Sequence, residues 1–259
     1  MRKIALTFTV TTLVLGVFGA FFRWLQLMNA FDKETGFPVP GAPITVVLIV
    51  YCVLAAAAFC LLTALWLGRY EGASGAETAL KCATGVPMIL SWVLCAAFAA
   101  SACVLLFSAG ASLTPMLQRL FGAFGILAAL AIPFLFGKNG GSGAGAMGRT
   151  AAAVLTVFFC FWTVFDYKSV SSDPIIWNYA FEILAVTVST LAVYHVTTFY
   201  YGIGKLPRTL VLLQLGVFLN ISVIFEQRSA PLNIMLGVSA ALQLLLEFLL
   251  IENMREKRD

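Results

Sequence analysis

The sequence predicts an all-α fold, a polytopic membrane bundle of eight transmembrane helices. Three observations lead to this fold class. Hydrophobic residues make up 61% of the chain, charged residues make up 11%, and the mean hydropathy is +0.96. Soluble domains carry about 25% charged residues, so this chain cannot cover a water-facing surface. Apolar runs of about 20 residues recur along the whole length, and lysine and arginine gather between them.

Each apolar run is interpreted as a helix, because only helices and closed barrels satisfy the backbone in lipid. The alternating segments of about ten residues that build a barrel are absent from the sequence. The third and fourth runs are separated by a short hairpin that Gly110 and Pro115 mark. The expected spans are 4–31, 44–67, 86–108, 115–136, 150–165, 175–200, 209–225 and 232–251.

The distribution of basic residues predicts the orientation. Eleven of the 16 lysines and arginines fall on the side of the N-terminus if the spans alternate, and five fall elsewhere. The positive-inside rule then places both termini in the cytoplasm. The first apolar run is longer than the core of a signal peptide and lacks a small-x-small cleavage site, so we interpret it as an uncleaved span. The expected location is the cytoplasmic (inner) membrane of a bacterium.

A single integral membrane domain, 1–259, is expected, with a glycine-rich stretch near its middle. This stretch, 138–149, is interpreted as a cytoplasmic linker between halves 1–137 and 150–259. The first and fifth spans contain the similar segments "VLGVFGAFF" and "VLTVFFCFW". Four spans in each half would give a 4+4 repeat of parallel orientation. Chance similarity between apolar segments is the alternative.

Two opposite charges inside the predicted spans identify a candidate ligand-binding site. Arg23 lies about 12 Å below the outer end of the first span, and Glu182 lies at a similar depth in the sixth. A charge in hydrocarbon costs on the order of 3 kcal/mol, so we expect Arg23 and Glu182 to approach each other, directly or through water. The alternative is that Arg23 extends to the lipid headgroups.

Three amides could line the same outward-facing pocket. Gln26 lies one turn from Arg23, Asn178 lies one turn from Glu182, and Asn220 lies near the outer end of the seventh span. The alternative for Gln26 and Asn220 is hydrogen bonding between helices. The remaining outer charges, which include Asp166, Glu226 and Arg228, are expected to be solvated in loops.

A second candidate pair lies in the inner half. His195 in the sixth span and Glu247 in the eighth could relay protons, because imidazole titrates near neutral pH. A bond from the histidine to a backbone carbonyl is the more ordinary role. With one histidine and no C-x-x-C pair among six cysteines, we expect neither a metal site nor a cofactor.

These features leave three function classes open. The first is binding or translocation of a small polar or anionic solute, with Arg23 holding the anionic group. The second is a non-catalytic subunit or scaffold that binds a membrane protein partner. The third is a membrane-embedded enzyme that modifies lipids or peptides, with His195 and Glu247 as its only evident acid–base pair. The lipid bilayer is the expected environment in each class. Nucleic-acid binding is excluded because no basic stripe interleaved with aromatics occurs.

Overall fold

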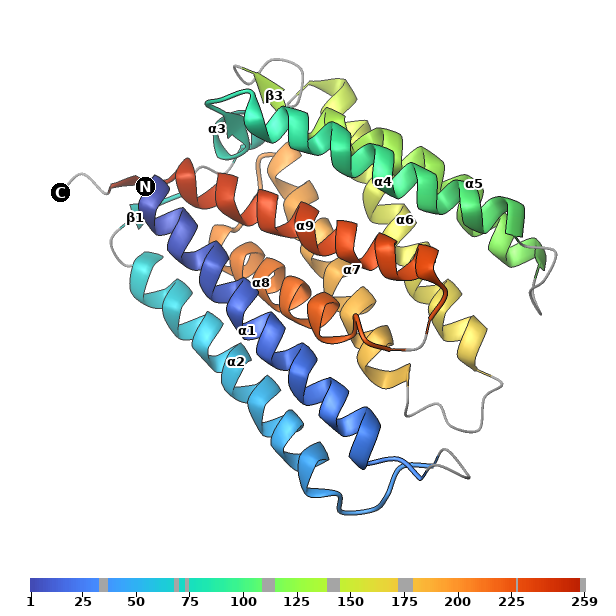
Figure 1. Cartoon of the computed structure of the whole chain (residues 1–259). Coiled ribbons are helices and arrows are strands. Elements are labelled where there is room, and N and C mark those ends of the chain that lie inside the picture. Colours follow the sequence, from blue (N-terminus) through green and yellow to red (C-terminus); the bar gives the residue numbers. More distant parts are fainter. Residues whose placement is uncertain are drawn as a thin grey trace.

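The computed structural model is a bundle of long helices that run roughly along one direction (Figure 1). It describes residues 1–32, 37–67, 70–72, 75–108, 115–138, 145–171, 179–226 and 228–256. Within these ranges, seven helices are long and apolar enough to cross a membrane, and α8 is a shorter apolar helix. The prediction of an all-α fold is therefore confirmed, and the long apolar helices are consistent with a membrane bundle. The count of eight spans and the 4+4 repeat stay predictions.

The helices follow the apolar runs closely. The long ones are α1 (Arg2–Asn29), α2 (Pro43–Leu67), α4 (Val86–Ser108), α5 (Pro115–Ala131), α6 (Ala146–Val170), α7 (Ala180–Tyr200), α8 (Leu206–Ser222) and α9 (Ala230–Glu252). The short elements are β1 (Tyr70–Glu71), α3 (Ala76–Ala79), β2 (Lys81–Cys82), the 3₁₀ helix η2 (Ile132–Leu135), β3 (Gly137–Lys138) and β4 (Arg255–Glu256).

Several boundaries differ from the predicted ones. Helix α5 ends at Ala131 where 136 was predicted, α6 ends at Val170 where 165 was predicted, and α8 spans Leu206–Ser222 where 209–225 was predicted. Helix α6 begins at Ala146, inside the predicted linker, because Gly145 adopts an extended conformation before a stretch that contains good helix formers. Helix α7 begins at Ala180, and the predicted start of the sixth span at 175 lies outside the described residues. Glu182 lies in the first turn of this helix.

Both described chain ends lie at one end of the bundle, which we call the terminal end (Figure 1). Strand β1 pairs with β4 in an antiparallel arrangement, and β2 pairs with β3 in parallel. The side chain of Asn253 donates hydrogen bonds to the carbonyls of Ala79 and Lys81, at 3.0 and 2.9 Å. These contacts hold the C-terminal end of α9 against the segment between α2 and α4. The α8–α9 turn lies at the opposite end of the bundle.

Helix α8 occupies a central position, with contacts to α1, α2, α7 and α9. Helices in a membrane associate mainly through van der Waals packing, because no strong hydrophobic force drives them together. Small residues allow their backbones to approach closely. On α1, a Cβ added at Gly19 would lie 2.3 Å from the Ser222 hydroxyl. On α5, a Cβ added at Gly122 would lie 2.8 Å from the backbone carbonyl oxygen of Ala102 on α4.

A group of aromatic rings fills the space between α4, α5 and α6. Phe121 and Phe165 stack with their ring centroids 4.2 Å apart. Phe98 and Trp162 meet edge to face, with centroids 6.1 Å apart. Aromatic pairs in such geometries stabilise a core by about 0.5–1.5 kcal/mol each beyond their area burial. This core holds the C-terminal half of α6 in place, and that half carries a residue of the candidate site.

Candidate functional site

The turn between α8 and α9 returns two opposite charges to the bundle. Glu226 Oε1 accepts hydrogen bonds from Arg23 Nε at 2.9 Å and from Arg23 Nη2 at 2.8 Å. Glu226 Oε2 accepts a hydrogen bond from Arg228 Nη2 at 2.7 Å. The side chain of Arg23 is 1% exposed and that of Glu226 is 7% exposed. Glu226 therefore neutralises an arginine of α1 and an arginine of its own turn at once.

Glu182 joins the same network from α7. Its Oε2 accepts a hydrogen bond from Arg228 Nη2 at 2.7 Å. The predicted partners Arg23 and Glu182 thus lie in one network, and Glu226 and Arg228 connect them. Arg23 also lies over the ring of Phe181, 4.8 Å from its centroid. Helix α7 therefore contributes an acid to Arg228 and a cation–π contact to Arg23.

Gln26 extends the network towards α2. Its side-chain oxygen accepts a short hydrogen bond from Arg23 Nη1, and its Nε2 donates to Thr45 Oγ1 at 3.1 Å. The prediction that Gln26 and Arg23 share a face of α1 agrees with this geometry. Because the amide bonds an arginine on one side and a hydroxyl on the other, it fixes the guanidinium relative to the start of α2.

Asp166 adds a third acid from the C-terminal half of α6. Its side chain is buried within hydrogen-bonding reach of Trp162, and its charge interacts with those of Arg228 and Glu226. The buried atoms Asp166 Oδ2 and Arg228 Nε have no hydrogen-bond partner among the described residues. The first is a hydrogen-bond acceptor and the second is a hydrogen-bond donor.

We call this set the charge cluster; its members are Arg23, Asp166, Glu182, Glu226 and Arg228. Among the described residues it contains two bases and three acids, so these five groups carry a formal charge of −1 when all are ionised. An uncompensated buried charge is costly, because the low dielectric of the interior does not solvate it. The cluster is therefore most stable when it holds one additional positive charge, as a proton or as a cation.

The expectation that Asp166, Glu226 and Arg228 are solvated loop charges was wrong. Their side chains are nearly fully enclosed. For Glu226 and Arg228 the physical reason is the short connection from Ser222 to Ala230, which cannot carry its charges far from the helix ends. Asp166 lies inside α6, which continues to Val170, beyond the predicted end of the fifth span. Opposite charges in such a short connection, facing an arginine expected within the first span, were the available sequence signal.

The other predicted amides lie apart from the cluster or outside the described residues. Asn220 is buried, and its Nδ2 donates a hydrogen bond to Ser189 Oγ of α7 at 2.8 Å. This contact is the interhelical bond that the alternative interpretation anticipated. Asn178 belongs to the range 172–178, which lies outside the described residues.

The predicted relay pair is not brought together. His195 is half-buried, its ring lies 5.5 Å from that of Tyr194, and it interacts with the charges of Arg208 and Lys205. Glu247 instead accepts hydrogen bonds from α1 and α8. The described hydrogen bonds include none between His195 and Glu247. The physical reason is the packing order, since α7 contacts α6 and α8 extensively, whereas α9 contacts α1, α4 and α8.

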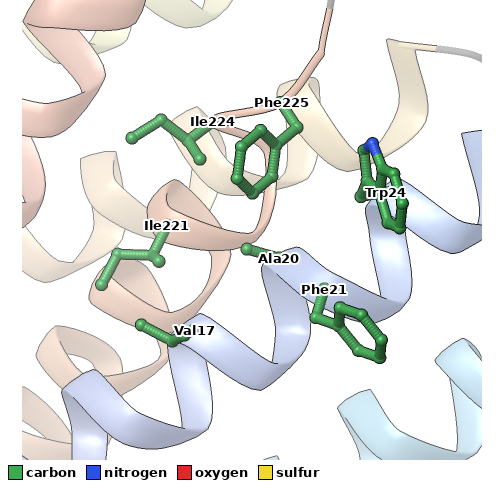
Figure 2. A pocket seen from close by; sticks show the side chains of 7 residues that line it. All are labelled: Val17, Ala20, Phe21, Trp24, Ile221, Ile224 and Phe225. Atoms are coloured by element: carbon green, nitrogen blue, oxygen red, sulfur yellow. The ribbon is translucent and has the colours of Figure 1, made fainter.

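A hollow of about 480 Å³ lies beside α1 and the α8–α9 turn (Figure 2). All its side chains are apolar except for the indole nitrogen of Trp24; they belong to Val17, Ala20, Phe21, Trp24, Ile221, Ile224 and Phe225. Such a lining fits acyl chains and offers little to a polar solute. We therefore base the functional argument on the charge cluster.

No group of three or more His, Cys, Asp or Glu residues in the described part of the chain could hold a metal ion. Cys82, in the segment between α3 and α4, is buried, and burial raises the pKa of its thiol, which makes it a poor nucleophile. No protein family model, curated protein or solved structure matches this chain. The functional argument therefore rests on the geometry described above.

Proposed function

We propose that this membrane protein binds a small polar solute that carries an ammonium group, and that the charge cluster is the binding site. The observation that carries the proposal is the surplus acid. Glu182 and Glu226 pair with the two guanidinium groups, and the buried Asp166 adds a third carboxyl group whose Oδ2 has no hydrogen-bond partner within the described chain. An ammonium group would supply both the missing donor and the missing positive charge.

The second unpartnered atom narrows the solute class. Arg228 Nε is a buried donor without an acceptor among the described residues. A solute with an oxygen near its ammonium group would satisfy Asp166 and Arg228 together, as an amino acid or an amino alcohol does. This assignment replaces Arg23 as the group that holds the solute, because Arg23 already donates to Glu226 and Gln26.

The competing proposal is a non-catalytic subunit in which the cluster only locks the helices. The network favours this proposal because it connects α1, α2, α7 and the α8–α9 turn through paired side chains. The two proposals differ at Asp166. If the cluster only stabilised the packing of the helices, a surplus carboxyl group with an unpartnered oxygen would add no stability. A site that binds an ammonium group requires such a carboxyl group.

The test is a thermal-unfolding screen of the purified protein in detergent, with matched small probes. Ethylammonium and glycine carry the ammonium group, ethanol lacks charge, and acetate carries the opposite charge. We expect ethylammonium or glycine, but not ethanol, to raise the unfolding midpoint of the wild type, because a ligand that binds only the folded state stabilises it.

The decisive variant is Asp166→Asn, with Glu77→Gln on the exposed side of α3 as its control. The asparagine oxygen can still accept a bond from Trp162, so the variant should fold. We expect Asp166→Asn to lose the ammonium response and Glu77→Gln to keep it. Equal responses in both variants, or no response in the wild type, would overturn the proposal. A response to acetate alone would support the anionic solute that the sequence suggested.

A further inference from the structure

A second polar cluster lies nearer the terminal end and is centred on Glu247 of α9. The Glu247 side chain is 0% exposed. Its Oε1 accepts hydrogen bonds from Thr12 Oγ1 of α1 at 3.2 Å and from Gln214 Nε2 of α8 at 3.0 Å. Thr63 of α2 donates in turn to Gln214 Oε1 at 3.4 Å. Helices α1 and α8 therefore place neutral polar groups against a single carboxyl group, and α2 supports one of them.

No counter-charge accompanies this carboxyl group. The side chains that face it from α1 and α8 are a hydroxyl and an amide, and no charged group of the described chain interacts with it. Helix α4 also packs against α9 but contributes no described hydrogen bond to Glu247. An ionised carboxylate in such a place costs several kcal/mol, so the neutral acid is the stable form.

Two buried oxygens on α9 lack a hydrogen-bond donor, and they indicate which oxygen of Glu247 would carry the proton of the neutral acid. Glu247 Oε2 and Gln243 Oε1 are both buried acceptors without a donor in the described chain. Gln243 Nε2 donates to Ser239 Oγ at 3.0 Å, so the orientation of this amide is fixed by that bond. Residues four apart lie on the same face of a helix. One proton on Oε2 would turn one of the two acceptors into a donor for the other.

The packing of Gln243 against Gly216 of α8 explains why its side-chain oxygen has no other donor. A Cβ added at Gly216 of α8 would lie 2.0 Å from Gln243 Oε1. The amide oxygen therefore fills the volume that a side chain at position 216 would need. Because helix α8 presents only backbone there, the oxygen remains without a side-chain donor unless Glu247 provides one.

We propose that Glu247 is a proton-binding site inside the membrane span, with its proton on Oε2 and directed to Gln243 Oε1. The carboxylate takes one proton from water and forms an O–H bond, and it returns that proton on release. Glu247 lies five residues before the end of α9, so the path to the terminal end is about 8 Å long. This site is separate from the charge cluster, and the proposal does not depend on the function assigned there.

Infrared spectroscopy of the protein in lipid nanodiscs tests this assignment. The measurement uses the Asp166→Asn background, because this variant has no surplus proton in the charge cluster. We expect a carbonyl stretching band of a protonated carboxyl group at neutral pH in Asp166→Asn that is absent from the double variant Asp166→Asn/Glu247→Gln. A band that persists unchanged in the double variant would overturn the proposal. Loss of the band from Asp166→Asn on addition of NaCl would also overturn it, because the site would then hold an inorganic cation.

Unfolding measurements give a second readout. Glutamine has the shape and the neutrality of a protonated glutamic acid, and its amide can donate to Gln243. We therefore expect Glu247→Gln to unfold at the same fraction of sodium dodecyl sulfate as the wild type. Leucine retains no polar atom for Thr12 or Gln214, so Glu247→Leu should unfold earlier. If Glu247→Gln failed to fold, the ionised form would be the one required, and the proposal would be wrong.

Discussion

Replacement of Glu226 by glutamine removes the charge that two arginines share. Arg23 donates to it through Nε at 2.9 Å and through Nη2 at 2.8 Å, and Arg228 donates through Nη2 at 2.7 Å. Arg228 keeps Glu182 as a partner, whereas Arg23 keeps the neutral Gln26 among its described hydrogen bonds. Loss of one partner from a buried ion pair costs about 3–5 kcal/mol, so we expect a destabilisation of that size.

The variant Glu182→Gln should destabilise the protein less than Glu226→Gln does. It removes one carboxylate from Arg228, which keeps the charge of Glu226 at 2.7 Å. A buried hydrogen bond to a charged group contributes about 1.5–3 kcal/mol, so the loss should be smaller than in Glu226→Gln. The assay is equilibrium unfolding in mixed micelles of dodecyl maltoside and sodium dodecyl sulfate, followed by circular dichroism.

Glu77→Gln supplies the baseline, because Glu77 is exposed and its replacement should leave the unfolding transition unchanged. The reasoning would be refuted if Glu226→Gln matched Glu77→Gln. It would also be refuted if Glu182→Gln destabilised the protein more than Glu226→Gln. Either result would mean that the guanidinium of Arg23 is not held by the turn between α8 and α9.

Two further predictions concern packing and orientation. Gly122→Ala should destabilise the protein by about 1–3 kcal/mol, because the new methyl group would meet backbone atoms of α4 at 2.8 Å. The control variant Gly237→Ala should be neutral or slightly stabilising, because nothing lies within 4 Å of the added methyl group. Equal effects of the two variants in the unfolding assay would refute this prediction. The terminal end is expected to face the cytoplasm. Green fluorescent protein fused to the C-terminus should therefore fluoresce in bacterial cells, and an alkaline phosphatase fused there should be inactive. The reverse pattern would contradict the positive-inside assignment.

The helices were predictable because lipid makes backbone satisfaction and apolarity the dominant constraints. Long runs of apolar residues therefore gave α1, α2, α4 and α9 within two residues at each end. The end of α6 was placed five residues too early, because the residues from Asp166 to Ser169 are mostly polar, although the helix continues to Val170. Composition alone cannot show where the hydrogen bonding of a helix ends.

The candidate site was predictable only in part. The cost of an intramembrane charge drew attention to Arg23 and Glu182, and the structure places both in one buried network through Glu226 and Arg228. Their immediate partners Glu226 and Arg228 were missed, because loop charges are usually solvated and only the tertiary arrangement shows that this turn folds inward. The pairing of His195 with Glu247 failed for a related reason, since sequence depth says nothing about which helices are neighbours.

We propose that the charge cluster, which carries one acid more than it has bases among the described residues, exchanges a proton for the ammonium group of a solute. Isothermal titration calorimetry with ethylammonium, in two buffers of different ionisation enthalpy, measures this exchange directly. We predict release of about one proton for each ethylammonium bound by the wild type, and none in Asp166→Asn. Binding by the wild type without proton release, or equal release in both proteins, would contradict the claim.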